Sequence, residues 1–219
     1  MILFKFATRS RPDKFKATID NIAKHATQPY HVRITADADD NTMFNYAMMQ
    51  WIGKRPELSI RYGTKVNKIE AVNRDMDITP DWDIVVAMSD DMEFIVKGFD
   101  EQIIAAFAGN YDQLVHFPDG YVNEKLVTLP IMGRLYYERF HYIYHTDYKS
   151  LWADNEQTIV AQTLGKYKYV DAKIYKHQHP AWTGGAVDAL LKETQNFYHE
   201  DEITYHRRKF RGFPKESVN

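Results

Sequence analysis

The chain has 219 residues, of which 44% are hydrophobic and 14% aromatic, so it is long and apolar enough to bury a core of domain size. Its 28 Lys and Arg nearly balance its 30 Asp and Glu, and the net charge of -2 excludes a general electrostatic attraction to nucleic acid or to anionic membranes. The absence of cysteine excludes disulfide scaffolds, thiolate metal sites and cysteine nucleophiles.

The amino terminus does not have the pattern of a targeting segment. Met1 to Ala7 turns polar too soon for a signal peptide, and no apolar run approaches the ~20 residues that span a membrane. We therefore expect a soluble protein and, from the lack of cysteine, a cytoplasmic one.

The first part of the chain alternates predicted strands and helices. Short apolar runs predict strands, and apolar residues spaced by three or four predict helices. In chain order we predict a strand at 2–7, a turn at 8–12, a helix at 13–26, a strand at 31–36, a helix at 42–53, a strand at 58–62, a helix at 65–76 and a strand at 84–88. This alternation predicts an α/β fold with a mainly parallel sheet and right-handed crossovers.

The second half of the chain has a less regular pattern. We predict a helix at 99–108, a strand at 114–117, a strand or turn at 126–129, a Tyr-rich helical region at 133–144, a helix at 154–164 and a strand at 169–175. Residues 183–219 are predicted to form a helical and basic extension.

The strongest functional signal is the apolar run 84–88, which is followed closely by Asp90 and Asp91. A buried strand here delivers both carboxylates to the carboxyl edge of the sheet, where open α/β folds bind ligands. Adjacent carboxylates repel each other unless a cation or solvent takes up the charge, so a divalent metal is the obvious candidate. A solvated turn after a strand explains the same pair equally well.

The order of these elements resembles the GT-A fold of nucleotide-sugar-dependent glycosyltransferases, a mixed, mainly parallel sheet flanked by helices. It is most similar to the large inverting glycosyltransferase family 2. The resemblance covers residues 1–182 and implies a nucleotide-sugar half at about 1–95 and an acceptor half at about 96–182. It rests on five stretches, namely Ala7 to Pro12, Asp37 to Asp40, Gly63 to Asn73, Ser89 to Asp91, and Trp152 to Asp154 together with His177 and His179.

The resemblance implies a metal site. Asp91, assisted by Asp90, is the expected carboxylate ligand, although Ser89 occupies the first position of the family's DXD element. His177 or His179 could complete the shell, which favours Mn2+ over Mg2+ because manganese accepts imidazole. The alternative for both histidines is a polar loop.

The resemblance also implies a general base that deprotonates the acceptor hydroxyl. Asp154 occupies the corresponding position before a predicted helix, with Glu156 as the second choice. An ordinary helix N-cap explains an aspartate at this position equally well.

The predicted donor-binding residues carry charges and amides suited to a nucleotide diphosphate. They are Thr8, Arg9, Arg11, Asp37, Asp39, Lys65, Asn67, Lys68, Asn73 and Asp90. Each lysine is as well explained by a solvated helix face, and the asparagines by local capping. The acidic stretch from Asp37 to Asp40 departs from the family pattern. This leaves open which aspartate contacts the nucleobase of the donor. A UDP-type donor is the default through the resemblance alone, and guanosine donors stay open.

The acceptor side is the least specific part of the sequence. The aromatic residues between Met132 and Tyr142, together with Trp152, could stack on a sugar but are more typical of a core. The basic segment His206 to Lys215 could bind a modified nucleic acid or form a solvated terminus. A glycan, a small molecule or a modified nucleic acid all remain candidate acceptors.

We therefore predict a metal-dependent glycosyltransferase that acts with inversion. Two alternatives stay open. A nucleotidyltransferase of similar architecture is disfavoured because residues 8–12 lack glycine, where such enzymes carry a Gly-rich loop. A non-catalytic nucleotide- or sugar-binding module with the same fold is the other.

Overall fold

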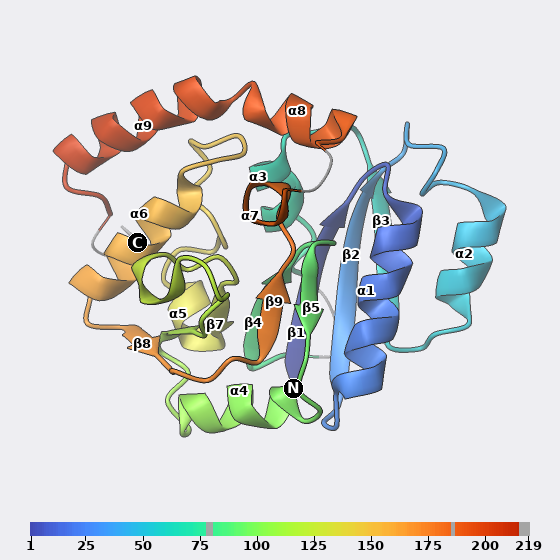
Figure 1. Ribbon diagram of the computed structural model, residues 1–219, viewed down its shortest axis with the longest axis horizontal. Coiled ribbons are helices and arrows are strands. Elements are labelled where there is room, and N and C mark those ends of the chain that lie inside the picture. The colour runs from blue at the N-terminus through green and yellow to red at the C-terminus, as the bar shows by residue number, and fades with distance from the viewer. Residues whose placement is uncertain (78–80, 185–186, 215–219) are drawn as a thin grey trace.

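A seven-stranded sheet forms the centre of the computed structural model, which describes residues 1–77, 81–184 and 187–214 (Figure 1). Its order is β3-β2-β1-β4-β7-β6-β8. The strands are β1 (Ile2–Thr8), β2 (Tyr30–Asp37), β3 (Leu58–Gly63), β4 (Ile84–Met88), β6 (Leu114–His116), β7 (Ile131–Gly133) and β8 (Tyr167–Tyr169). A separate antiparallel pair consists of β5 (Met92–Phe94) and β9 (Tyr175–His177).

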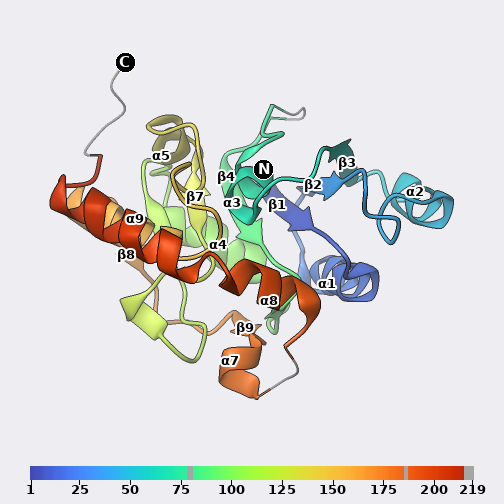
Figure 2. The same cartoon turned by 90° about the horizontal axis from the view of Figure 1, so that it is seen from above.

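Helices flank both faces of the sheet and cross its upper edge in Figure 1. They are α1 (Pro12–His25), α2 (Tyr46–Gly53), α3 (Lys68–Asn73), α4 (Phe99–Phe107), the 3-10 helix η1 (Asn123–Lys125), α5 (Arg134–Glu138), α6 (Ala153–Thr163), α7 (Pro180–Thr183), α8 (Ala189–Gln195) and α9 (Tyr198–Phe210). Seen from above in Figure 2, α8 and α9 follow one another across the molecule, above the ends of the central strands. Within the described residues, every helix is too short or too polar to cross a lipid bilayer.

The first four strands of the sheet are parallel, as the sequence predicts. β1 pairs with β2 and β4, and β2 pairs with β3, all in parallel register. Their carboxyl ends therefore lie along one edge, which carries Thr8, Asp37, Gly63 and the residues that follow Met88. Predicted functional residues from four separate parts of the chain are thereby collected at one edge.

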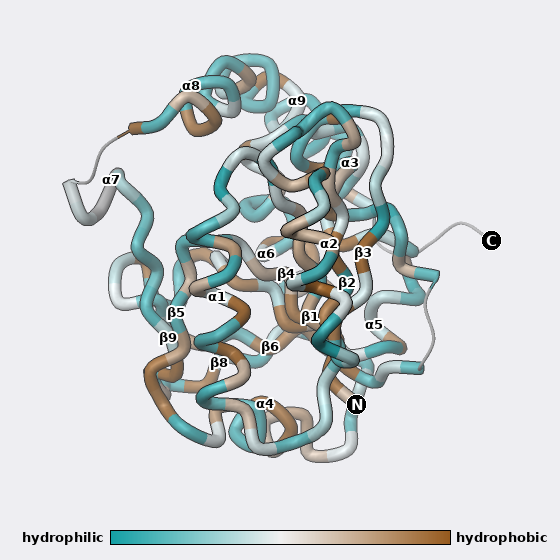
Figure 3. Tube along the Cα trace, turned by 90° about the vertical axis from the view of Figure 1, so that its right-hand side faces the viewer, coloured by the Kyte–Doolittle hydropathy of each residue, from teal (hydrophilic) through white to brown (hydrophobic). Residues whose placement is uncertain are grey.

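Alternation along the strands divides the core between the two faces of the sheet. Phe4, Phe6 and Val86 belong to a cluster shared with α1 and α4, whereas Leu3 and Val85 belong to one shared with α5 and α6. Figure 3 shows the hydrophobic residues concentrated along these central strands. Because both faces are covered, β4 is a continuous apolar run, whereas β2 buries His31, Arg33 and Thr35 among its apolar residues.

Residues 126–129, predicted as a strand or a turn, form no strand and bend at Thr128 and Leu129. The strand of this region is β7, at Ile131–Gly133, and it runs antiparallel to both β4 and β6. Val127 and Leu129 are fully buried without belonging to a strand, so their apolar character reflects packing.

Other predicted boundaries are also wrong. The helix expected at 65–76 is confined to α3, and the Tyr-rich region is helical only in α5. The helix expected at 42–53 begins at Tyr46, where the side chain of Asn45 caps α2. The strand expected at 169–175 is instead the connection between β8 and β9, which occupy its two ends.

The carboxyl-terminal helix α9 packs on the rest of the chain through its first turns, whereas most of the described residues of the basic segment that begins at His206 are exposed, which agrees with the solvated alternative. Asp201 is fully buried, and its carboxylate accepts the backbone N–H groups of Lys149, Ser150 and Leu151 at 2.8 to 2.9 Å. Phe210, at the end of α9, is 93% exposed. Lys215, the last residue of the predicted basic segment, lies outside the described residues, and the division at residue 182 stays a prediction.

Candidate functional site

Asp91 and His177 face each other beyond the carboxyl end of β4. The turn Ser89-Asp90-Asp91 leads from β4 directly into β5, and β5 pairs with β9 so that Met92 lies opposite His177. This register places the Nε2 atom of His177 3.5 Å from Oδ2 of Asp91. The two strands lie side by side near the centre of Figure 1. Residues 86 positions apart thus form one polar pair.

The surroundings of this pair stabilise opposite charges on its members. Burial favours a neutral Asp91, but the nearby His177 and the hydroxyl of Ser89, which donates to Oδ1, outweigh it and hold the Asp91 pKa well below its usual range. Burial also lowers the pKa of His177, but the carboxylates of Asp119 and Asp91 outweigh it and raise that pKa to about 9. Asp91 is therefore ionised at neutral pH.

Asp119 completes this cluster, and the sequence analysis missed it. It follows β6 and is 1% exposed. Its Oδ1 accepts three successive backbone N–H groups, those of Tyr121, Val122 and Asn123, at 2.8 to 3.2 Å. Its Oδ2 accepts the hydroxyl of Thr128 at 3.3 Å and lies 3.9 Å from Nδ1 of His177. The Pro118-Asp119-Gly120 stretch is a turn signal, but it carries no sign of the distant histidine.

Asp91 and His177 together fit part of the shell of a divalent ion. A carboxylate oxygen and an imidazole nitrogen 3.5 Å apart compare well with neighbouring ligands of an octahedral ion, which at bond lengths near 2.2 Å lie about 3 Å apart. No trio of His, Asp and Glu side chains within the described residues is arranged to hold a metal alone. The remaining positions of such a shell would therefore belong to ligand oxygens and water, as is common for Mg2+ at phosphate sites.

Asp90 turns away from Asp91 toward the first strand. Its Oδ1 accepts from Nη1 of Arg11 at 2.8 Å, and only 7% of its side chain is exposed. Burial raises the pKa of Asp90, and Arg11 opposes this rise. The Nε and Nη2 atoms of Arg11 donate to the two oxygens of Asp188, each at 2.7 Å. Arg11 therefore joins the aspartate pair to the segment that begins α8.

Arg9 connects the ends of β1 and β2. Its Nη1 donates to Asp37 at 2.8 Å and to Asp39 at 2.6 Å, and Arg74 approaches Asp37 from the other side at 3.5 Å. The hydroxyl of Thr8 is buried and has no hydrogen-bond partner within the described residues. The structure thus brings together Thr8, Arg9, Asp37 and Asp39, four of the predicted donor-binding residues.

Three predicted donor-binding residues between Lys65 and Asn73 make contacts within the fold. Asn67 caps α3 through the N–H of Glu70, and Asn73 exchanges hydrogen bonds with the backbone of Ile143 and Tyr144. The contact of Asn67 agrees with the local-capping alternative, whereas Asn73 bonds a distant segment of the chain, and both asparagines have structural roles. Lys65 pairs with Glu193 of α8 at 2.6 Å.

Lys68, at the start of α3, is exposed and lies near the predicted site residues. Its positive charge lowers the pKa of Asp91, Asp154 and His179, so its ammonium lies within electrostatic reach of all three.

Asp154 is the second residue of α6, so the expectation of an ordinary N-cap is wrong. The N-cap is Trp152, in a left-handed conformation with φ 63°, and it has no capping side-chain bond. Asp154 accepts hydrogen bonds from the backbone and side chain of Asn155 at 2.9 and 3.1 Å. Burial raises the pKa of Asp154, and Lys68 opposes this. Asp154 is half-buried, and a carboxylate with a raised pKa is a stronger base than one with an ordinary pKa.

Glu156 is fully engaged in a structural cluster. It accepts Tyr148 at 2.7 Å and two guanidinium donors of Arg208 at 2.7 and 2.8 Å, and only 4% of its side chain is exposed. The second choice for the catalytic base is therefore occupied by a salt bridge to α9.

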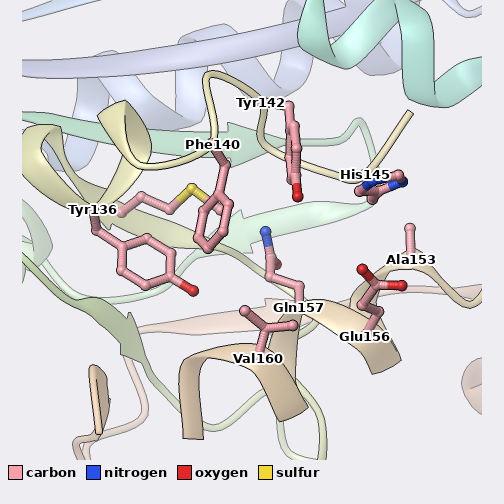
Figure 4. A pocket seen from close by; sticks show the side chains of 9 residues that line it. Tyr136, Phe140, Tyr142, His145, Ala153, Glu156, Gln157 and Val160 are labelled. Carbon is pink, nitrogen blue, oxygen red and sulfur yellow. The ribbon is translucent and has the colours of Figure 1, made fainter. Parts of the chain in front are cut away.

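The openings of the structure differ in size and in lining. A groove of about 520 Å³ runs between α1 and β5, and Asp90 and Asp91 lie on its wall. A second cavity of about 20 Å³ lies among aromatic residues of α5 and the chain that follows it, next to α6 (Figure 4). It has room for a water molecule but not for a sugar. Tyr136 and Tyr137 are 2% and 8% exposed, so this aromatic stretch belongs largely to the core.

Comparisons with known proteins identify the fold. No protein-family model and no curated sequence matches the chain. The mannosyltransferase PcManGT from Pyrobaculum calidifontis, solved with GDP-Man and Mn2+, aligns with a TM-score of 0.62 and 16% identity over 78% of this chain and 54% of its own. S. aureus TarS residues 1–349 align with a TM-score of 0.63 and 11% identity over 82% of this chain and 60% of that one. The same TarS fragment solved with UDP aligns with a TM-score of 0.62.

These likenesses show that the chain has a glycosyltransferase-like α/β fold. The chain spans 54 to 60% of the length of these structures, and at these identities the similarity concerns the fold alone.

Proposed function

We propose that this protein is a metal-dependent glycosyltransferase that moves a sugar from a nucleotide-diphosphate sugar to an acceptor hydroxyl with inversion. The observation that supports it most is the Asp91–His177 pair at the carboxyl edge of the sheet, with Lys68 within electrostatic reach. The similar structures solved with GDP-Man and Mn2+ or with UDP are consistent with this choice.

Asp91 and His177 are the proposed protein ligands of the metal. The combination of carboxylate and imidazole favours Mn2+ over Mg2+. When bound, such an ion stabilises the negative charge that develops on the departing diphosphate. Asp90 is proposed to act differently, by holding Arg11 close to this position, because the hydrogen bond between them is 2.8 Å long.

Cationic side chains of the edge are proposed to bind the donor. Lys68 and Arg11 lie near the carboxylate pair and can neutralise the diphosphate oxygens. Arg9, Asp37 and Asp39 form one hydrogen-bonded group at the ends of β1 and β2, which suits recognition of the base and ribose. The unpartnered hydroxyl of Thr8 is a further candidate for the same nucleoside.

Asp154 is the proposed general base. It takes the proton of the acceptor hydroxyl while the oxygen forms a bond to the anomeric carbon and the sugar–phosphate bond breaks on the opposite face, which inverts the configuration. Its burial supports this role, since a raised pKa makes the carboxylate a stronger proton acceptor. A glycan, a small molecule and a modified nucleic acid remain the candidate acceptors.

The test is release of nucleoside diphosphate from a panel of UDP- and GDP-sugars with Mn2+, with candidate acceptors supplied as mixtures. We expect turnover with one donor class, and loss of at least about 100-fold in rate for Asp154→Asn, since general acid–base catalysis contributes about 100- to 10,000-fold. The exposed Asp171→Asn is the matched control and should retain the rate of the unmodified protein.

Two outcomes would contradict the proposal. Full activity in a folded Asp154→Asn protein would remove the assigned base. Binding of a nucleotide sugar without any turnover would support a binding module, and release of pyrophosphate from a nucleoside triphosphate would support a nucleotidyltransferase.

A further inference from the structure

The imidazole of His177 lies between two carboxylates, one facing each nitrogen. Nε2 faces Asp91 at 3.5 Å, and Nδ1 faces Asp119 at 3.9 Å. The ring is largely buried, with 11% of the side chain exposed. Its Nδ1 atom is fully buried and has no hydrogen-bond partner in the part of the chain that the structure describes.

A buried ring nitrogen without a partner is costly, so the atom that it faces is informative. Asp119 is in turn fixed by its surroundings, because three backbone N–H groups hold its Oδ1. Its Oδ2 is left to Thr128 and to His177. One oxygen of this carboxylate therefore anchors the turn after β6, while the other is presented to the histidine.

We propose that Asp119 is a positioning residue that accepts the Nδ1 proton of His177 and thereby directs the Nε2 lone pair to a divalent metal shared with Asp91. The inference rests on the proposed function, because it assumes that the Asp91–His177 pair binds a metal. It adds Asp119, which lies 58 positions before His177 in the sequence. The Oδ1 atom of Asp119 is held by the turn after β6 and is not available to the metal.

The chemistry of imidazole explains why such a partner matters. A neutral histidine carries one ring proton, and the hydrogen bond made by one nitrogen decides whether the other is free to bind a metal. A carboxylate behind a metal-binding histidine fixes this tautomer and the ring orientation. The distance of 3.9 Å is longer than a hydrogen bond, so the two side chains must approach each other by about 1 Å, as catalytic contacts commonly tighten when ligands bind.

Asp119→Asn separates the two roles of this side chain. The Oδ1 of asparagine can still accept the three backbone N–H groups, while its amide nitrogen replaces the oxygen that faces His177. An amide N–H cannot accept the Nδ1 proton, so the favoured tautomer places the proton on Nε2, where the metal would bind. The fold should therefore survive while the metal site is weakened.

The experiment measures Mn2+ affinity of the full chain from the electron paramagnetic resonance signal of free Mn2+, with and without UDP or GDP. We expect Asp119→Asn and His177→Gln each to weaken Mn2+ binding by about 10- to 100-fold. Glu93→Gln removes a negative charge from the neighbouring strand β5 and can still bond Gln178 through its amide oxygen, so it should change the affinity by less than about 3-fold, because a partly exposed charge is screened by solvent. The variant that combines Asp119→Asn with His177→Gln should bind Mn2+ no more weakly than His177→Gln alone, because Asp119 acts through the histidine.

Additive losses in the double variant, or unchanged Mn2+ affinity in a folded Asp119→Asn protein, would overturn the inference and leave the proposed function standing. Absence of Mn2+ binding in the unmodified protein would refute both. A second measurement needs no variant, namely 15N NMR of His177 in unmodified protein saturated with diamagnetic Cd2+. The inference requires the proton on Nδ1 and the metal on Nε2, and the opposite arrangement would exclude it.

Discussion

Removal of Arg208 should destabilise the protein strongly. The guanidinium of this α9 residue makes two hydrogen bonds to Glu156, at 2.7 and 2.8 Å, and a third to Asp147 at 2.9 Å. The side chains of Arg208 and Glu156 are only 14% and 4% exposed, so Arg208→Ala leaves a buried carboxylate with Tyr148 as its remaining partner. Breaking a buried pair from one side costs about 3 to 5 kcal/mol, whereas the more exposed contact with Asp147 adds at most about 1 kcal/mol.

The assay is urea unfolding followed by tryptophan fluorescence, since Trp152 packs against Tyr205 of α9 with ring centroids 5.1 Å apart. The matched control is Arg207→Ala, whose side chain is 52% exposed and approaches Asp147 at only 3.8 Å. We expect a loss of at least about 3 kcal/mol for Arg208→Ala and less than about 1 kcal/mol for Arg207→Ala. Equal losses in the two variants would refute the reasoning, and with it the view that α9 is an integral part of the fold.

Three further predictions concern packing and pH. Gly133→Ala places a Cβ 2.1 Å from the carbonyl oxygen of Tyr111 and should lower the free energy of unfolding in urea by at least about 3 kcal/mol. The Cβ of Gly53→Ala meets nothing within 4 Å, so this variant should stabilise the protein by up to about 1 kcal/mol. Equal effects of the two variants would contradict the packing around Gly133. The rate of transfer should rise with pH as Asp154, whose pKa burial raises, loses its proton, and a profile that is flat above the ordinary aspartate range would argue against this base. In metal-free protein the pKa of His177 is raised from 6.5 to about 9, so its stabilising contribution is complete below pH 6.5 and is lost as the pH rises through 9. Melting curves should show this loss in the unmodified protein and not in His177→Gln.

The parallel half of the sheet could be predicted because β1, β2 and β4 are almost entirely buried. Runs such as Ile84–Met88 are continuously apolar, and their positions within the chain alternate with helical patterns. Strand β5, with three residues, and the antiparallel β7 gave no comparable signal, because they are defined by their partners rather than by their own periodicity. Local sequence does not contain that information.

The position of a candidate site residue was predictable where the residue follows directly from a strand end. Asp91, Asp37 and Arg9 lie at the edge where parallel strands end, so their proximity follows from the topology. Asp119 was missed because it follows a short strand and meets His177 only through tertiary packing. Glu156 looked available as a base because the sequence could not reveal that Arg208, 52 residues later, folds back to pair with it.

The central claim is that Asp91 helps to bind a metal and a nucleotide sugar, and melting curves test it most directly. The unmodified protein and Asp91→Asn should be melted with UDP, GDP and their sugars, each with Mn2+, Mg2+ or a chelator. A ligand at about 100 times its dissociation constant adds about 2.7 kcal/mol, which for a chain of this size raises the melting temperature by about 5 to 10 °C. We predict such a rise for one nucleotide class with Mn2+, and its loss both with chelator and in Asp91→Asn. No rise with any nucleotide, or a rise that is the same with chelator and in Asp91→Asn, would contradict the assignment.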